Sequence, residues 1–273
     1  MAPRTYITKA NGHRVQFNEN KILSTCRRAG ADKQTAQRIV KKVKSQIYQG
    51  IGTDNIYKLV LHAISEEKGG RGLHQRYKLK EAIMNLGPNG FAFENYVGNV
   101  LQHYGLEIKG IRSKIKGKCA THEIDLIAIS RNKKFLIECK HNSYRGGFIG
   151  LKVALYTHAR FLDTLPKFEA EAIVCNAKVS SQAKKYAKCI GQQVFSWRYP
   201  PKQSLEKIIE DYKLYPITIL NLNHVELEKF SQQNIMIAKD LLKYKESLLS
   251  KLTGISEKRI HNLTKLVEQI ISK

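Results

Sequence analysis

The stretch that decides the fold reads His122-Glu123-Ile124-Asp125-Leu126-Ile127-Ala128-Ile129-Ser130, then Arg131-Asn132-Lys133, then Lys134-Phe135-Leu136-Ile137-Glu138-Cys139-Lys140. Two apolar runs of strand length on either side of a short polar turn predict a β-hairpin. If the turn centres on Asn132-Lys133, Asp125 faces Lys140 across the hairpin and Ile127 faces Glu138. Because side chains alternate along a strand, we expect Asp125, Glu138 and Lys140 on one face.

Two carboxylates and an ammonium group gathered on one face suit phosphodiester hydrolysis. Asp125 and Glu138 supply the hard oxygen ligands that Mg²⁺ prefers, and a bound ion acidifies water. Lys140 can orient that water or neutralise developing charge. The alternative is a structural ion pair between Asp125 and Lys140, because a Glu-x-Lys triplet alone is common. An aspartate at matching register on the facing strand favours the catalytic interpretation, with Asp125 and Glu138 as the metal ligands.

Helices and strands alternate on both sides of this hairpin, which predicts a mixed α/β layer architecture with the core order αβββαβ. The expected elements are a helix at Phe91–Tyr104, strands at Glu107–Lys114, His122–Ser130 and Lys134–Lys140, a helix at Phe148–Leu165, a strand at Glu171–Asn176, a helix at Ser180–Ile190 and a strand at Gln193–Trp197.

Ile124-Asp125 followed by Glu138-Cys139-Lys140 resembles the D…ExK core of the PD-(D/E)XK nuclease superfamily, and is most similar to Mrr-type restriction endonucleases and archaeal Holliday-junction resolvases. The resemblance covers about residues 88–200 and implies a restriction-endonuclease-like fold. In that family an upstream helix supplies one more glutamate, and Phe93-Glu94-Asn95-Tyr96-Val97 matches that position. Glu94 shares a helical face with Val97, and an inward glutamate is costly unless something pairs with it. Glu94 therefore joins Asp125, Glu138 and Lys140 as an expected catalytic residue.

Composition points to a polyanionic partner. Lys and Arg number 47 against 23 Asp and Glu, a net charge of +24, of which residues 201–273 carry only +3. Such an excess favours binding to DNA, although an adaptation for solubility is the alternative. The five cysteines are odd in number and lack Cys-x-x-Cys spacing, which argues against a disulfide framework or a zinc site. No apolar run is long enough for a membrane helix, so we expect a cytoplasmic protein.

Turn residues predict domain boundaries. Gly87-Pro88-Asn89-Gly90 and Tyr199-Pro200-Pro201 suggest regions 1–88, 89–200 and 201–273. The first region is expected to begin with a β-hairpin around Asn11-Gly12, with strands at Tyr6–Lys9 and Arg14–Phe17, followed by helices at Glu19–Ala29, Lys33–Gln49, Thr53–Glu67 and Leu73–Asn85.

The run Ile7-Thr8-Lys9-Ala10-Asn11-Gly12-His13-Arg14-Val15-Gln16-Phe17-Asn18-Glu19-Asn20-Lys21-Ile22 resembles the ATP-cone, a regulatory nucleotide-binding domain. The resemblance implies that Lys9 and Lys21 reach the phosphates of ATP or dATP and that Asn18 lies near the base. Ile22 also falls at a pattern position, and Thr53 matches a threonine before the third helix, where it is the expected N-cap. A cone that serves only as a basic DNA-contact module is the alternative.

The last region is expected to be helical. Helices at Leu227–Leu242 and Leu248–Ile270, hinged at Leu252-Thr253-Gly254-Ile255-Ser256, resemble a helix-hairpin-helix DNA-binding module. Such modules place a glycine-containing turn against the DNA backbone. A helical dimerisation bundle is the alternative.

Together these features predict a Mg²⁺-dependent DNA endonuclease of restriction or repair type, modulated by ATP or dATP. One site per chain favours a homodimer for cutting both strands. The alternatives are a non-enzymatic, nucleotide-sensing DNA-binding regulator and a structure-specific junction resolvase.

Overall fold

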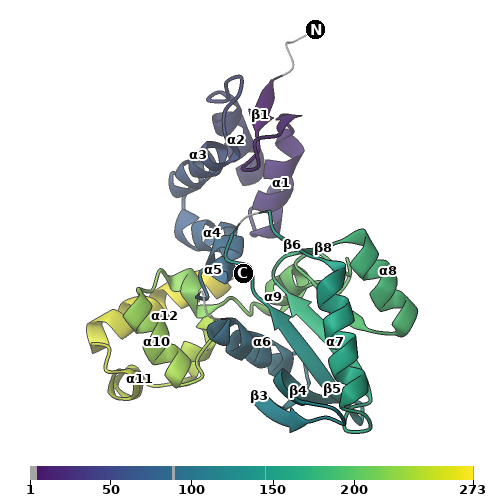
Figure 1. Ribbon diagram of the computed structural model, residues 1–273. Coiled ribbons are helices and arrows are strands. Elements are labelled where there is room, and N and C mark those ends of the chain that lie inside the picture. The colour runs from purple at the N-terminus through teal and green to yellow at the C-terminus, as the bar shows by residue number, and fades with distance from the viewer. Residues whose placement is uncertain (1–4, 88–89, 145, 273) are drawn as a thin grey trace.

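The computed structural model describes residues 5–87, 90–144 and 146–272, arranged as three regions around a central junction (Figure 1). The N-terminal region lies at the top of the view, a mixed sheet with its helices at the lower right, and the C-terminal helices at the lower left. The expected boundary at Pro88-Asn89 falls outside the described residues. Within the described part of the chain, every helix is too short or too polar to cross a membrane.

The N-terminal region follows the expected order. Strands β1 (Tyr6–Thr8) and β2 (Arg14–Gln16) form an antiparallel hairpin, and four helices follow: α1 (Glu19–Arg28), α2 (Lys33–Lys44), α3 (Thr53–Ser65) and α4 (Gly70–Tyr77). Their inward side chains, including Ile39, Val60 and Ile64, form a separate apolar core.

Two details of this region differ from expectation. The helix expected at Leu73–Asn85 is two helices, because α4 ends at Tyr77 and α5 (Leu79–Met84) begins after Lys78. Thr53 is not the N-cap of α3. Gly52 occupies that position, and Thr53 is the first helical residue.

The central sheet has the strand order β3-β4-β5-β7-β9. The strands are β3 (Glu107–Lys116), β4 (Thr121–Ser130), β5 (Lys133–Lys140), β7 (Ala170–Cys175) and β9 (Gln193–Phe195). The first three are antiparallel, whereas β5, β7 and β9 are parallel and are joined through α7 (Leu151–Asp163) and α8 (Ser181–Ile190). With α6 (Phe91–His103) in front, this confirms the order αβββαβ.

Helices cover both faces of the sheet. Side chains such as Leu126 and Ile137 pack in one cluster with Tyr96 of α6, while Ile173 and Cys175 face the other way, toward α7 and α8. The helix expected to begin at Phe148 begins later, because Phe148–Ile149 forms strand β6, paired in parallel with β8 (Lys178–Val179).

The C-terminal region contains α9 (Leu205–Tyr212), the 3₁₀ helix η1 (Ile217–Leu220), α10 (His224–Gln232), the 3₁₀ helix η2 (Ala238–Lys243), α11 (Glu246–Thr253) and α12 (Glu257–Ile271). The expected continuous helix Leu227–Leu242 is wrong. It ends at Gln232, Asn234 adopts a left-handed φ of 54°, and Met236 accepts a backbone hydrogen bond from Ile217. The expected hinge is confirmed, with Gly254 in the left-handed conformation and Ser256 capping α12.

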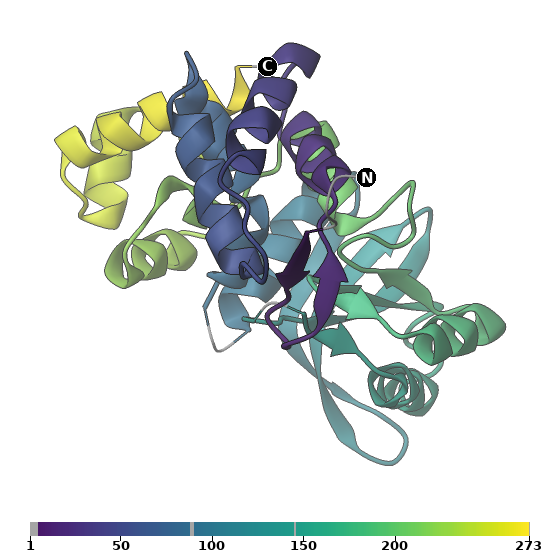
Figure 2. The ribbon, with the colours of Figure 1, turned by 90° about the horizontal axis from the view of Figure 1, so that it is seen from above.

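The junction between the N- and C-terminal regions is built around Arg76 of α4. Its Nε donates to the Ala29 carbonyl at the end of α1 (2.5 Å), and its Nη1 donates to the Ile270 carbonyl at the end of α12 (2.8 Å). A cation suits the carbonyl ends of two helices. Figures 1 and 2 both place α12 beside α4.

Gly72 permits this close approach, and its replacement tests the junction. A Cβ at Gly72 would lie 2.2 Å from the Gln269 carbonyl oxygen. Alanine normally stabilises a helix interior relative to glycine. Here we expect Gly72→Ala to lower the free energy of unfolding by about 1–3 kcal/mol, because α12 must shift. Urea denaturation measures it, with Gly52→Ala as the control for the added methyl group, since no atom lies within 4 Å of a Cβ there. Gly52 is the N-cap of α3, so this control should cost less than about 1 kcal/mol. A stabilised Gly72→Ala variant would contradict this packing.

Candidate active site

The register of the β4–β5 hairpin differs from expectation by one cross-strand step. Arg131 and Asn132 form its turn, both with positive φ (48° and 63°), so Ser130 pairs with Lys133. Asn132 tolerates this left-handed conformation well, which places the turn one residue earlier than predicted. The last pair is Leu126 with Ile137. Asp125 is therefore level with Glu138, and the expected pairing of Asp125 with Lys140 is wrong.

The hairpin ladder opens at Asp125. Ile124 and Ile127 lie in one apolar cluster with Leu136. In a regular strand, side chains three residues apart point to opposite faces of the sheet. Because Ile124 and Ile127 lie in the same cluster, the regular alternation of β4 is interrupted between them. At this point the Asp125 carboxylate accepts a hydrogen bond from the Cys139 backbone N–H (2.7 Å). The carboxylate thus lies across the end of β5, next to the residues on either side of Cys139.

Glu138 is almost fully buried, 1% exposed, and is held by two cations. Its Oε1 lies 2.5 Å from Lys140 Nζ, and its Oε2 accepts from Nη1 of Arg160, a buried residue of α7. Arg160 was not predicted from the sequence as a site residue. It lies on the same stripe of α7 as the buried Ala154 and Thr157, and an arginine on a buried stripe requires an anionic partner. That position could have indicated its role.

Glu94 comes from the first turn of α6, and its side chain is 14% exposed. Its buried Oε2 has no hydrogen-bond partner, and the nearest cation, Arg112, stands 3.8 Å away, which is an ion pair but beyond hydrogen-bond distance. Burial, and next the charge of Asp125, raise the pKa of Glu94 to about 7 against the opposing effect of Arg112. The charge of Glu94 is therefore poorly compensated.

Burial and neighbouring charges also shift the pKa values of Asp125 and Lys140. Burial and the charge of Glu138 raise the pKa of Asp125, although the Cys139 N–H and Lys140 oppose this. Burial is the largest single influence on Lys140 and lowers its pKa, but the hydrogen bond to Glu138 and the charges of Glu138 and Asp125 together outweigh it, so the pKa is raised. The structure thus brings Glu94, Asp125, Glu138 and Lys140 into one electrostatic unit that holds excess negative charge.

The donor chemistry of this unit fits a hard cation in part. In the described part of the chain, no three His, Cys, Asp or Glu side chains are gathered closely enough to form a cation-binding group. Both oxygens of Glu138 are engaged, although each keeps a second lone pair. The unpaired oxygen of Glu94 and the raised pKa of Asp125 mean that added positive charge would be stabilised. Asp125 and Glu138 are the residues that could hold such an ion.

The expected nucleotide residues lie at the hairpin of the N-terminal region. Lys9 is exposed in the β1–β2 turn, and a bridge between Thr8 and Gly52 brings Thr53 next to it. Asn18 caps α1 by accepting from Asn20 N–H (3.0 Å), and Lys21 is exposed in its first turn. Ile22 is buried and belongs to the apolar core of this region.

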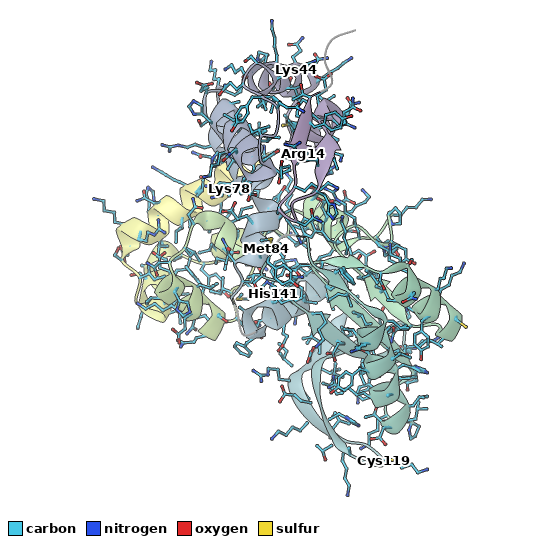
Figure 3. All side chains as sticks on the ribbon, turned by 45° about the horizontal axis from the view of Figure 1, so that its top comes forward. Arg14, Lys44, Lys78, Met84, Cys119 and His141 are labelled. Carbon is cyan, nitrogen blue, oxygen red and sulfur yellow. The ribbon has the colours of Figure 1, made fainter. Side chains whose placement is uncertain are left out.

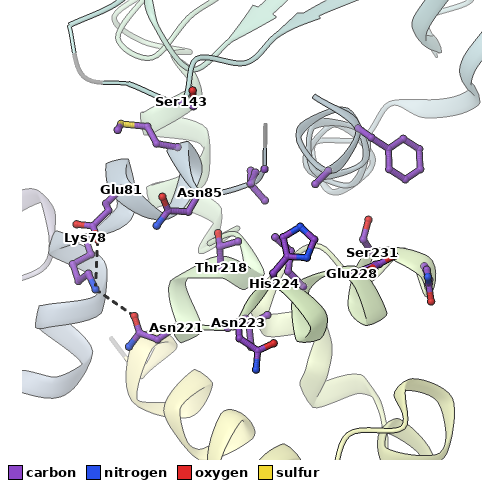
Figure 4. Close-up of a pocket in the computed structure, with 18 residues that line it drawn as sticks. Lys78, Glu81, Asn85, Ser143, Thr218, Asn221, Asn223, His224, Glu228 and Ser231 are labelled. Atoms are coloured by element: carbon purple, nitrogen blue, oxygen red, sulfur yellow. Dashed lines mark hydrogen bonds and ion pairs between the residues drawn. The ribbon is translucent and has the colours of Figure 1, made fainter. Parts of the chain in front are cut away.

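A cavity of about 910 Å³ lies elsewhere, between α5, the start of α6 and α10 (Figure 4). Lys78 and Asn221 both line it, and Nζ of Lys78 donates a hydrogen bond to Oδ1 of Asn221 (3.3 Å). None of the four residues of the candidate active site lines it. The side chains of Glu94 and Glu138 are instead largely buried, at 14% and 2% exposure, and Lys140 is partly exposed beside Glu138.

Comparisons with known proteins identify the two ends of the chain. Residues 5–83 match the ATP cone domain family, and residues 215–271 match the family described as AF1548-like, C-terminal. An uncharacterised protein of Archaeoglobus fulgidus is 33% identical over 176 residues, which span 64% of this chain and 99% of that protein.

Two solved structures complete the comparison. A crystal structure described as a protein of unknown function, AF1548, is similar with a TM-score of 0.62 and 32% identity, over 67% of this chain and 99% of that one. The DNA modification-dependent restriction endonuclease AspBHI matches at 16% identity and a TM-score of 0.41, over 58% of this chain and 40% of that one. A likeness as low as the second carries no functional inference.

The raised pKa of Glu94 predicts a pH-dependent effect on stability. Between its ordinary pKa of 4.5 and its folded value of about 7, the folded chain binds more protons than the unfolded chain. Ionisation of Glu94 therefore lowers the free energy of unfolding as pH rises through this window. We expect Glu94→Gln to raise the free energy of unfolding by about 1–3 kcal/mol at pH 8 and by much less at pH 5.

Urea denaturation in the presence of a chelator measures both differences. Glu107→Gln is the matched control, because that carboxylate is exposed and is paired with Lys109, not with Arg112. Equal effects of Glu94→Gln at the two pH values would show that Glu94 is not a strained, buried acid.

Proposed function

The chain belongs to the AF1548-like family and carries an ATP-cone domain, and we propose that it is a metal-dependent DNA endonuclease that cuts at Asp125, Glu138 and Lys140. One observation carries the proposal. The charges of Glu94, Asp125 and Glu138 act on one another near the opened end of the hairpin, and the neighbouring cations leave the charge of Glu94 poorly compensated. A folded chain accepts that cost where a cation or a reacting group completes the site.

Each residue has a distinct proposed role. Asp125 and Glu138 hold Mg²⁺, which when bound polarises a phosphate oxygen and acidifies water. Lys140, whose side chain is partly exposed beside Glu138, binds the phosphate as a point charge. Arg160 fixes the orientation of Glu138. A carboxyl group with a pKa of about 7 can exchange protons at neutral pH, so Glu94 is the proposed general base.

DNA is the proposed substrate because of the net charge of the chain and the exposure of Lys140. The chain carries +24, and basic side chains project from the surface of all three regions (Figure 3). A field of that sign attracts phosphate backbones. Lys140, with 38% of its side chain exposed beside Glu138, is the group of this site that a backbone phosphate can reach. Restriction and repair are both compatible with this geometry.

ATP or dATP is the proposed regulator, acting through Lys9, Asn18, Lys21 and Thr53. The three-residue β1–β2 ladder separates the turn at Lys9 from the start of α1 by about 10 Å, within reach of two lysine side chains and one polyphosphate. Ile22 of α1 is buried in the apolar core of this region and packs the helix against it. Two such ammonium groups bind phosphate without a glycine-rich loop.

A short chain of contacts joins the cone to the proposed cutting site. After α4, helix α5 carries Ile83, whose carbonyl accepts from Nε2 of His141 at 2.9 Å. His141 directly follows Lys140, and its ring also packs on Phe93, the neighbour of Glu94. A nucleotide affects cutting only if it binds one arrangement of these elements more tightly than another.

A non-enzymatic DNA-binding regulator that senses nucleotide is the second candidate. Lys140 and Arg160 together neutralise Glu138, as a purely structural ion-pair network would. This interpretation predicts DNA and nucleotide binding without cleavage at any metal concentration. A homodimer suits either candidate, since both act on a two-stranded polymer.

Conservative substitutions test the cutting site. We expect Asp125→Asn and Glu138→Gln to lower Mg²⁺-dependent cleavage by at least about a hundredfold, because each removes a charge that would hold the ion or the transition state. Affinity for DNA should stay within a few-fold of wild type. Cleavage is measured on plasmid, junction and methylated DNA, with and without chelator.

Glu107→Gln is the control for these variants and should cut normally, because Glu107 is exposed and paired with Lys109. Wild-type cleavage rates in both Asp125→Asn and Glu138→Gln would remove the active-site assignment. Binding with no cleavage of any substrate by the wild type would favour the regulator.

Nucleotide binding is tested by calorimetry with ATP and dATP. We expect Lys9→Ala and Lys21→Ala each to weaken binding by about tenfold or more, the effect of losing one charge-assisted hydrogen bond. Lys33→Ala, an exposed lysine at the start of α2, should bind like wild type. Identical affinities in all four proteins would leave the cone as a scaffold or a DNA clamp.

A further inference from the structure

Helix α7 presents a stripe of three residues that leads from solvent to the candidate active site. Lys152, Tyr156 and Arg160 are spaced four apart and therefore lie on one side of the helix. Arg160, at the buried end, donates to Glu138. Lys152, at the other end, is exposed. Tyr156 lies between them, with its ring 5.1 Å from the Arg160 guanidinium carbon.

The position of Tyr156 is unusual for a large aromatic side chain. It is 57% exposed although one side of its ring covers Arg160. The other ring face is therefore open to solvent, next to the group that fixes Glu138. Two more exposed aromatic residues, Tyr144 and Phe148, lie in the short connection between Lys140 and α7. Aromatic rings interleaved with cations are the surface that proteins use to bind exposed nucleobases.

We propose that Tyr156 stacks on an unpaired base of the substrate, so that the chain acts on single-stranded or locally unpaired DNA. This rests on the proposed nuclease function and names its substrate class. Bases inside a duplex offer only their edges in the grooves, whereas stacking on a side chain requires a free base face. Lys152 then binds the backbone phosphate that flanks the stacked base, and Lys140 binds the phosphate that is cut.

A second copy of the chain is the competing occupant of this surface. Leu155 and Leu162 are also exposed on α7, and apolar side chains on one helix can form a dimer contact. A two-fold contact through this face would, however, bring together two surfaces that each carry the exposed Lys152. The positive charge around Tyr156 is complementary to a polyanion and not to itself, which favours nucleic acid.

The test uses the full chain with the cleavage-blocking Asp125→Asn substitution and single-stranded DNA that contains 2-aminopurine. Stacking on Tyr156 quenches the fluorescence of this base. We expect quenching with the single strand and with a duplex containing an unpaired bulge, and none with the perfect duplex. Tyr156→Ala should abolish quenching and weaken single-strand binding about five- to a hundredfold.

Three further variants separate stacking from structure. Tyr156→Phe should keep quenching, because it keeps the ring. Tyr156→Leu should lose quenching while it still covers Arg160, and thermal melting checks that both variants fold. Tyr48→Ala removes an equally exposed tyrosine, 59% exposed and distant in the sequence, and should bind like the parent protein.

The outcomes distinguish the substrate class from the nuclease function. The inference would be overturned if Tyr156→Ala cut perfect duplex at an undiminished rate and the parent protein showed no quenching. That result would leave the proposed nuclease function intact. Quenching that depends on Tyr156, without cleavage by the wild type, would support the stacking site and overturn the nuclease. Conversion of a dimer to a monomer by Tyr156→Ala in sedimentation would assign the surface to a second copy and overturn the stacking site.

Discussion

The contact between Arg160 and Glu138 constrains the whole central region. Glu138 lies in the middle strand of a sheet covered on both faces, where an unpaired carboxylate would cost several kcal/mol. Arg160 satisfies it only because α7 crosses back over the sheet between β5 and β7. The same guanidinium supports the ring of Tyr156, so one ion pair fixes both the acidic centre and the exposed surface beside it.

The open end of the β4–β5 ladder explains why the neighbouring acids are strained. Past Leu126 the two strands no longer pair, and the Asp125 carboxylate takes the Cys139 N–H that a regular ladder would give to a backbone carbonyl. The charge of Glu138 raises the pKa of Asp125, and the charge of Asp125 in turn raises the pKa of Glu94. Neighbouring cations compensate Glu138 well and Glu94 poorly. The result is a local excess of negative charge in a strongly basic chain.

The three regions are connected through buried polar contacts as well as apolar packing. Arg76 joins the carbonyl ends of α1 and α12, and His141 joins α5 to the end of β5. A single apolar cluster also runs from Leu79 of α5 to Ile270 of α12. Because α5 lies at the end of the stretch that matches the ATP cone and belongs to this cluster, a change in the cone's arrangement would reach both of the other regions. The fold therefore offers a physical link between the ATP-cone domain and the acidic site.

The sequence by itself determined the order of elements, the hairpin and the identity of the charged residues, because these follow from local periodicity and turn chemistry. The turn at Asn132 lies one residue earlier than predicted, which shifts the pairing of the two strands by two residues. Because a shift of two residues keeps every side chain on the same face, Asp125, Glu138 and Lys140 remain neighbours. Only the tertiary structure decided that Arg160 pairs with Glu138, that the helix after Leu227 breaks at Gln232, and that α12 docks on Gly72. Those contacts join residues 22 to about 200 positions apart, and no local pattern encodes which buried carboxylate, carbonyl or helix face a distant side chain will meet.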